Sequence, residues 1–107
     1  MTINLRATNL ELTAAITEYV QTKVDMLEKY LGDIQVINCD FEVEKAVGGQ
    51  NKGEIFRAEI NLQIPRELLR VEKTESDLHK AIDKVKDHVE AMIISYKEKL
   101  RDKKRGK

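Results

Sequence analysis

The hydrophobic positions of this chain follow two periodicities, and their order along the sequence predicts the fold. Over residues 76–105 apolar side chains recur at steps of three and four, which places one stripe along an α-helix. The stripe consists of Leu78, Ala81, Ile82, Val85, Val89, Met92, Ile93, Tyr96 and Leu100. Ser76 or Asp77 is expected to cap the first amide groups. Because about 28 helical residues span about 42 Å, the last turns are expected to project beyond the domain.

Elsewhere the apolar side chains alternate with polar ones, as in β-strands with one buried face. The alternating stretches are residues 1–8, 35–46 and 56–64, and a short fourth strand is expected over residues 69–73. The glycine-rich stretch 47–53 predicts a long antiparallel hairpin, which Pro65 ends because proline cannot donate to the ladder. Arg57 and Glu59 are expected to lie across the ladder from an acidic row.

A second helix is predicted over residues 13–32. Thr13 is its expected N-cap, and Gly32 provides the left-handed position that commonly ends a helix. Its buried face comprises Ile16, Val20, Val24, Leu27 and Leu31. The order strand, helix, three strands, helix predicts an α+β domain. This β-α-β-β-β-α sandwich has a four-stranded, mostly antiparallel sheet with both helices packed on one face.

A further row runs along the first predicted helix beside its buried face. It consists of Tyr19, Lys23, Met26 and Tyr30. In one interpretation this row is the edge of the core. In the other it is a surface where tyrosine and lysine contact a phosphate backbone.

Composition indicates one folded domain over residues 1–102, followed by a basic end at residues 103–107. The net charge is zero, which argues against a protein that coats nucleic acid indiscriminately. Residues 95–107 nevertheless carry a charge of +5 and the remainder −5, so an anionic partner is expected to bind at the C-terminal end. The end at 103–107 has two interpretations, a disordered solubilising segment or a phosphate contact.

The chemistry of an enzyme or a metal site is not predicted. The single cysteine, Cys39, is expected to be a buried strand residue. His79 and His88 lie nine residues apart on one helix and so do not share a face. No serine or cysteine pairs convincingly with a histidine base, so we expect no enzymatic activity, no metal and no cofactor.

Two other classes are excluded by similar reasoning. Gly48 and Gly53 have the spacing of a phosphate-binding loop, but Glu54 takes the place of its lysine and the segment joins two strands. No segment has the 18 or more apolar residues that a membrane-spanning helix needs, and no signal peptide precedes the first strand. The expected location is therefore the cytoplasm.

Several short segments carry a resemblance to a known family. They are residues 13–16 (TAAI) with Lys23, 43–45 (VEK), 69–72 (LRVE), 77–83 (DLHKAID) and 96–100 (YKEKL). In their order and spacing they resemble the ribosome hibernation promoting factors, also called ribosome-associated translation inhibitors. The fold that this resemblance implies is the sandwich predicted above, which looks like a double-stranded RNA-binding domain with an added first strand.

The resemblance implies a non-enzymatic protein that binds ribosomal RNA in the decoding region of the small ribosomal subunit and inhibits translation under stress or in stationary phase. Its implied partners are the small subunit and ribosomal RNA, without DNA or a membrane. RNA contacts carried over from the family are Lys23, Lys45, Lys84, Lys97 and Lys99, and surface position adds Lys80, Lys86 and Arg101.

The sequence also departs from the family pattern. Lysine or arginine is common in the family at the positions of His88, Ala91 and Ser95, and lysine is frequent at the position of Met26. His88 is kept as a candidate RNA contact, but binding is expected to be weaker and less salt-dependent than in a basic relative. The chain resembles a short form without the second domain that pairs ribosomes, and a monomer is expected over a dimer.

Two alternatives remain open at this point. One is a different RNA-binding module that recognises duplex RNA by its shape. The other is a protein-interaction or dimerisation module of the same fold, in which Ile94, Ala91 and Ser95 form a helix-packing patch in place of the missing basic row.

Overall fold

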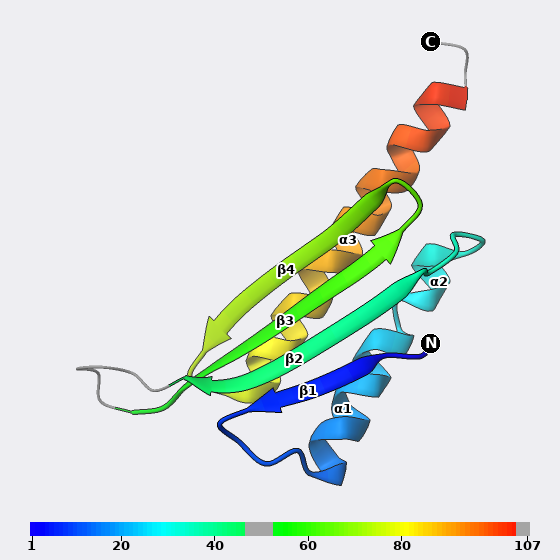
Figure 1. The fold of residues 1–107 in the computed structure, drawn as a ribbon. Coiled ribbons are helices and arrows are strands. Elements are labelled where there is room, and N and C mark those ends of the chain that lie inside the picture. Colours follow the sequence, from blue (N-terminus) through cyan, green and yellow to red (C-terminus); the bar gives the residue numbers. More distant parts are fainter. Residues whose placement is uncertain (47–52, 105–107) are drawn as a thin grey trace.

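The computed structural model describes residues 1–46 and 53–104. Its elements are β1 (Asn4–Thr8), α1 (Ala14–Asp25), α2 (Glu28–Leu31), β2 (Asn38–Ala46), β3 (Ile55–Ile64), β4 (Glu67–Glu75) and α3 (Leu78–Lys104). The strands form one sheet in the order β1-β2-β3-β4 (Figure 1). β1 pairs with β2 in parallel, and the other two pairings are antiparallel. The predicted α+β fold is therefore confirmed, whereas its likeness to a double-stranded RNA-binding domain stays a prediction.

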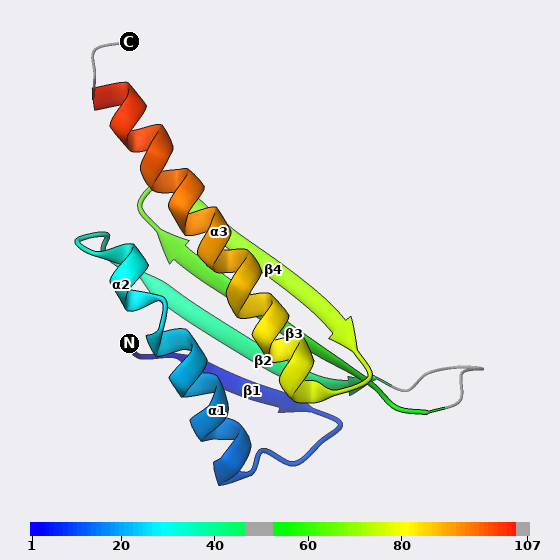
Figure 2. The ribbon, with the colours of Figure 1, turned by 180° about the vertical axis from the view of Figure 1, so that it is seen from behind.

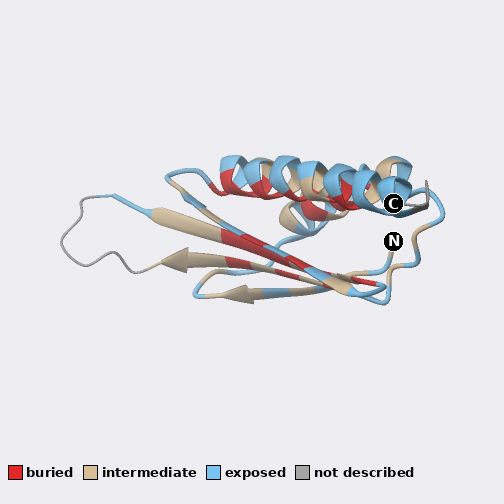
Figure 3. Cartoon of the chain, turned by 90° about the horizontal axis from the view of Figure 1, so that it is seen from above, coloured by how far each residue is buried: buried red, intermediate tan, exposed pale blue. Residues whose placement is uncertain are grey.

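All helices cover the same face of the sheet, and the core lies between the two layers (Figures 2 and 3). Cross-strand neighbours such as Phe41 and Ile60 present their side chains to this core, because alternate residues of a strand point to the same face. From α3, Ile82 and Ile93 meet them with no exposed surface. The parallel pairing of β1 and β2 requires a crossover, which α1 and α2 provide.

The first helix is not continuous, contrary to the prediction of one helix over residues 13–32. The N–H of Met26 donates to both Thr22 and Lys23 carbonyls at 3.2 Å, and the N–H of Leu27 donates to Val24 at 2.9 Å. The bonds to Lys23 and Val24 have three-residue spacing and tighten the chain between α1 and α2. Leu27 remains fully buried. The predicted ends are confirmed. The Thr13 side chain accepts a bond from Ile16 N–H, and α2 ends at Gly32 with a φ of +57°.

α3 begins as predicted, with Asp77 Oδ1 accepting from the His79 N–H at 2.9 Å. It then extends past the end of the sheet (Figure 1). One residue of the predicted stripe does not join the core, because Leu100 lies on this projecting part and is 42% exposed. The helix continues through Lys104, past the predicted start of the basic end at residue 103. The predicted hairpin connection at 47–53 lies mostly outside the described residues, as do residues 105–107.

The sheet face that carries no helices holds a network of charges centred on Arg57. Its guanidinium group donates to four carboxylates at 2.6–3.3 Å, those of Glu42, Glu44, Glu59 and Glu72. Burial alone would raise the pKa of Glu59, but bonds from Arg57, Arg70 and Asn61 outweigh it and hold the pKa below its usual value. The predicted pairing of Arg57 with acidic residues across the ladder is confirmed.

The boundary of the core can be tested with two truncations on α3. Ile93→Ala removes a fully buried side chain, and we expect it to lower the free energy of unfolding by about 2–5 kcal/mol. Leu100→Ala, at an exposed position, is expected to change it by less than about 0.5 kcal/mol. Urea denaturation followed by circular dichroism measures both, and equal losses would contradict the exposed position of Leu100.

Candidate nucleic-acid interface

The contact between α1 and α3, here called the seam, is built around Asp83. Tyr19 Oη donates to Asp83 Oδ1 at 2.6 Å, and Lys23 Nζ lies 3.1 Å from the same oxygen. The His79 ring packs edge-on against Tyr19 with 4.4 Å between centroids. The row of Tyr19, Lys23, Met26 and Tyr30 is thus mainly the edge of the core, although Met26 is 42% exposed.

These contacts set the charges of the seam at neutral pH. Burial would raise the pKa of Asp83, but the bonds from Tyr19 and Lys23 outweigh it and hold the pKa below 3.8. The bond to Asp83 raises the pKa of Tyr19 to about 12. Asp83 is therefore ionised and Lys23 is paired with it, which leaves little net positive charge at this part of the surface.

Three more of the predicted RNA-binding lysines have carboxylate partners. Lys45 Nζ lies 2.8 Å from Glu54. Lys84 Nζ lies 2.6 Å from Glu75, and its bond lowers the pKa of that carboxyl group. Lys86 Nζ lies 2.8 Å from Glu90 and 3.3 Å from Asp87. Lys23, Lys45, Lys84 and Lys86 are thus neutralised within the chain.

Lys97, Lys99 and Arg101 lie where α3 leaves the sheet. Lys97 Nζ donates to the Tyr30 carbonyl at 2.8 Å, which ties α3 to α2. Lys99 and Arg101 are exposed on the next turn, and Lys80 is exposed near the start of the helix. Within residues 1–46 and 53–104, none of these three makes an ion pair. The structure therefore divides the predicted residues into a paired group and an unpaired group.

Two basic residues near this end were not singled out from the sequence. Arg66 occupies the two-residue turn between β3 and β4, with a φ of +70°. The neighbouring Pro65 carbonyl accepts a bond from Tyr96 Oη at 2.8 Å, which holds the turn against α3. Lys29 on α2 lies over the Tyr30 ring, 5.2 Å from its centroid. Apolar and polar residues begin to alternate again directly after Pro65. This pattern could have placed Arg66 at the tip of a hairpin.

The flank of α3 that lacks the basic row faces the β4 edge. His88, Ala91 and Ser95 are exposed, and they border a groove of about 300 Å³ together with Lys99 and Glu67. His79 packs on Tyr19 instead, so the two histidines lie on different sides of the helix. Ile94 is 39% exposed, as the protein-interaction alternative requires, but self-association stays an untested prediction.

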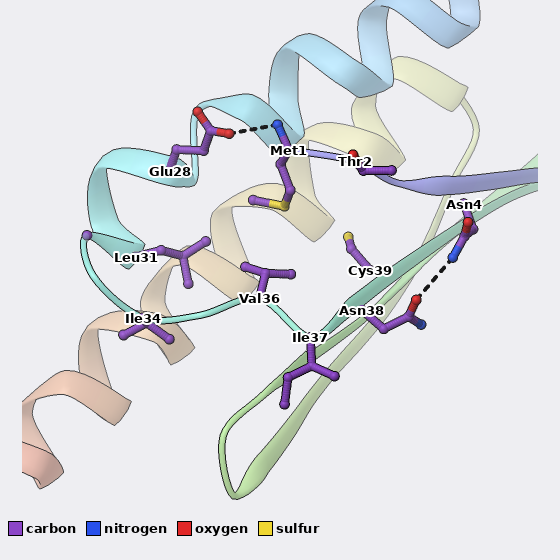
Figure 4. Close-up of a pocket in the computed structure, with 11 residues that line it drawn as sticks. Met1, Thr2, Asn4, Glu28, Leu31, Ile34, Val36, Ile37, Asn38 and Cys39 are labelled. Carbon is purple, nitrogen blue, oxygen red and sulfur yellow. Dashed lines mark hydrogen bonds and ion pairs between the residues drawn. The ribbon is translucent and has the colours of Figure 1, made fainter.

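A second cavity, of about 630 Å³, lies between the start of β1, α2 and the start of β2 (Figure 4). Asn4 donates to Asn38 across it at 3.1 Å, and the amino group of Met1 pairs with Glu28 at 2.7 Å. Cys39 is buried at its base, as predicted, and burial raises the pKa of its thiol to about 12. Such a thiol is protonated at neutral pH and is a poor nucleophile.

Across residues 1–46 and 53–104 the histidine, cysteine and carboxylate side chains form no group of three or more that could hold a metal ion. None of the helices described there combines the length and apolar character that crossing a bilayer requires.

Comparison with known proteins identifies the family. The chain belongs to the sigma 54 modulation protein / S30EA ribosomal protein family, whose model matches residues 3–101. It is 31% identical over 107 residues to a ribosome hibernation promotion factor of Lactococcus lactis subsp. cremoris, covering 96% of this chain and 53% of that protein. A ribosome hibernation promotion factor of Deinococcus radiodurans is 28% identical over 93 residues, covering 87% and 47%. The chain thus spans about half the length of these curated relatives.

Solved structures agree with this assignment. The Protein Y N-terminal domain of Thermus thermophilus superposes with a TM-score of 0.71 at 32% identity, covering 90% of this chain and 99% of that one. A ribosomal subunit interface protein from Coxiella burnetii gives a TM-score of 0.75 at 15% identity, which supports the fold alone. The family predicted from the sequence is confirmed, and the relatives bear the names of ribosome hibernation factors, a non-enzymatic family.

The hydrogen bond and ion pair of Asp83 at the seam predict how the stability of the fold depends on pH. Folding lowers the pKa of Asp83 below its unfolded value near 3.8. The ionised carboxylate therefore contributes fully to the free energy of unfolding above that pH, and this contribution is lost as the pH falls through the lower pKa of the folded state. We therefore expect Asp83→Asn to lower the melting temperature at pH 6, and the gap to wild type to narrow as the pH falls from 5 toward 2. Thermal unfolding across this range measures the gap. A constant difference would contradict an ionised, hydrogen-bonded Asp83.

Proposed function

We propose that this chain binds the small ribosomal subunit through ribosomal RNA of the decoding region and holds the ribosome inactive under stress or in stationary phase. The observation that carries this proposal is the family match over residues 3–101, which spans every strand and all but the last residues of α3. The proposed partners are the small subunit and its RNA in the cytoplasm. The protein acts as a monomer and needs no cofactor.

The charge distribution supports an RNA partner. The chain has no net charge, yet exposed cations without a carboxylate partner in the described structure gather where α3 leaves the sheet. Lysine and arginine in such a setting release counterions when they meet phosphates, which makes binding favourable and salt-dependent. A balanced total charge with one basic region favours a defined site on RNA over indiscriminate coating.

Inhibition on this account requires no chemistry. The molecule is elongated, with principal extents of 54 × 28 × 18 Å. A body of this kind, held by phosphate contacts, excludes messenger and transfer RNA from the space that it fills. The proposal therefore depends on where the protein binds.

Cosedimentation with purified ribosomal particles tests the proposal. We expect the protein to sediment with small subunits and whole ribosomes at low salt, and much less at high salt. Isolated large subunits serve as the control, and bare duplex RNA serves as a competitor. Absence of binding to small subunits even at low salt would contradict the proposal, and equal competition by duplex RNA would favour the shape-specific alternative.

Restoring the family's basic row should strengthen binding. His88→Lys, Ala91→Arg and Ser95→Lys are expected together to tighten small-subunit binding and to steepen its salt dependence by up to about 0.7–0.9 per new phosphate contact. As a control, Leu68→Lys and Thr74→Lys add charge on the opposite sheet face, where both side chains are exposed. An equal gain per added charge in the control would show that position on α3 does not matter.

A further inference from the structure

We infer that the phosphate contacts of this chain are concentrated on one end of the molecule and not along the seam between the helices. This inference rests on the proposed RNA-binding function and specifies the surface that performs it. The end surface is formed by α2, the β3–β4 turn and the last turns of α3. Its basic residues are Lys29, Arg66, Lys97, Lys99, Arg101 and Lys103.

Two hydrogen bonds bring the parts of the end surface together. Tyr96 Oη donates to the Pro65 carbonyl at 2.8 Å, so the turn that carries Arg66 lies against one side of α3. Lys97 Nζ donates to the Tyr30 carbonyl at 2.8 Å, so α2 lies against the other side. Both bonds leave from adjacent residues of α3. The helix itself extends past the end of the sheet (Figures 1 and 2). Basic side chains from three separate segments therefore share one end.

The seam and the β4 flank of α3 have the opposite character. At the seam Lys23 shares Asp83 with Tyr19, and Lys86 pairs with Glu90 and Asp87. On the flank that faces β4, Lys84 pairs with Glu75. A phosphate that approaches one of these lysines also approaches its carboxylate. The contact must either break the ion pair or accept the repulsion, and fewer counterions are released because the lysine already has an anionic neighbour.

On the end surface a phosphate can contact a basic side chain without breaking an ion pair. Arg66, Lys99 and Arg101 are exposed and make no ion pair within residues 1–46 and 53–104. Lys97 donates to a neutral carbonyl and not to a carboxylate. Three acidic residues, Glu67 beside the groove that Lys99 borders and Glu98 and Asp102 on α3, reduce the positive charge of this end but do not cancel it. Counterion release per basic residue is therefore larger here than at the seam.

The open face of the sheet restricts how RNA can approach. Its outward side chains include Asp40, Glu42, Glu44, Glu59 and Glu72, against Arg6, Arg57 and Arg70. Arg57 lies within the acidic network and Arg70 donates to Glu59, so neither is free for a phosphate. This face has a negative balance and disfavours RNA, which leaves the end and the helix side for binding.

Two triple variants with the same net charge test the inference. The end variant carries Arg66→Gln, Lys99→Gln and Arg101→Gln. The comparison variant, here called the seam variant, removes three ion-paired lysines: Lys23→Gln and Lys86→Gln on the α1 side of α3, and Lys84→Gln on the β4 flank. Lys97 is left intact because it ties α3 to α2. Small-subunit affinity is measured for both and for wild type across a salt series, and circular dichroism with thermal unfolding confirms that each variant is folded.

We expect the end variant to lose affinity on the order of 100-fold at 0.1 M salt and its salt slope to fall by about 2–3, as removal of three phosphate contacts requires. The seam variant is expected to change by less than about threefold. A seam variant that loses as much affinity as the end variant, or more, would overturn the inference. If wild type itself fails to bind, the proposed function is wrong, so the two failures are distinguishable.

Discussion

Packing of the α3 stripe against the apolar face of the sheet is the constraint on which the rest of the structure depends. Ile82, Val89 and Ile93 are fully buried against strands whose inward side chains have no other apolar layer to cover them. This contact fixes the rotation of α3 about its axis. It thereby decides which lysines face α1, which face the β4 edge and which extend past the sheet.

The distribution of charge follows from this packing. Lysines on the two flanks of α3 lie next to other elements and meet their carboxylates, as Lys84 meets Glu75. Lys99 and Arg101 on the projecting turns stay exposed and make no ion pair within residues 1–46 and 53–104, although Glu67 borders the same groove as Lys99. On the other side of the sheet, Arg57 gathers four carboxylates into a largely satisfied network. One molecule thus presents an acidic face and a basic end.

The sequence predicted the features that depend on local pattern. Hydrophobic periodicity identified both helical faces, and the hairpin register placed Arg57 among glutamates across the strands. Leu100 continues the predicted stripe but lies outside the core, because periodicity does not reveal where the sheet beneath a helix ends. The break after Asp25 was missed because a tight turn can keep the same side chains buried. Ion pairs such as Lys23 with Asp83 join residues far apart in the sequence, so the division into paired and unpaired lysines required the structure. The RNA contacts themselves stay predictions.

The most direct test of the account is a structure of this chain bound to the small ribosomal subunit, determined by electron cryo-microscopy. The account predicts that the chain lies in the decoding region with Arg66, Lys99 and Arg101 within hydrogen-bonding distance of RNA phosphates. The acidic face of the sheet should point away from RNA, and the ion pair of Lys23 with Asp83 should stay intact. A complex in which the seam lysines leave their carboxylates to contact phosphates, while the end of α3 points into solvent, would contradict it.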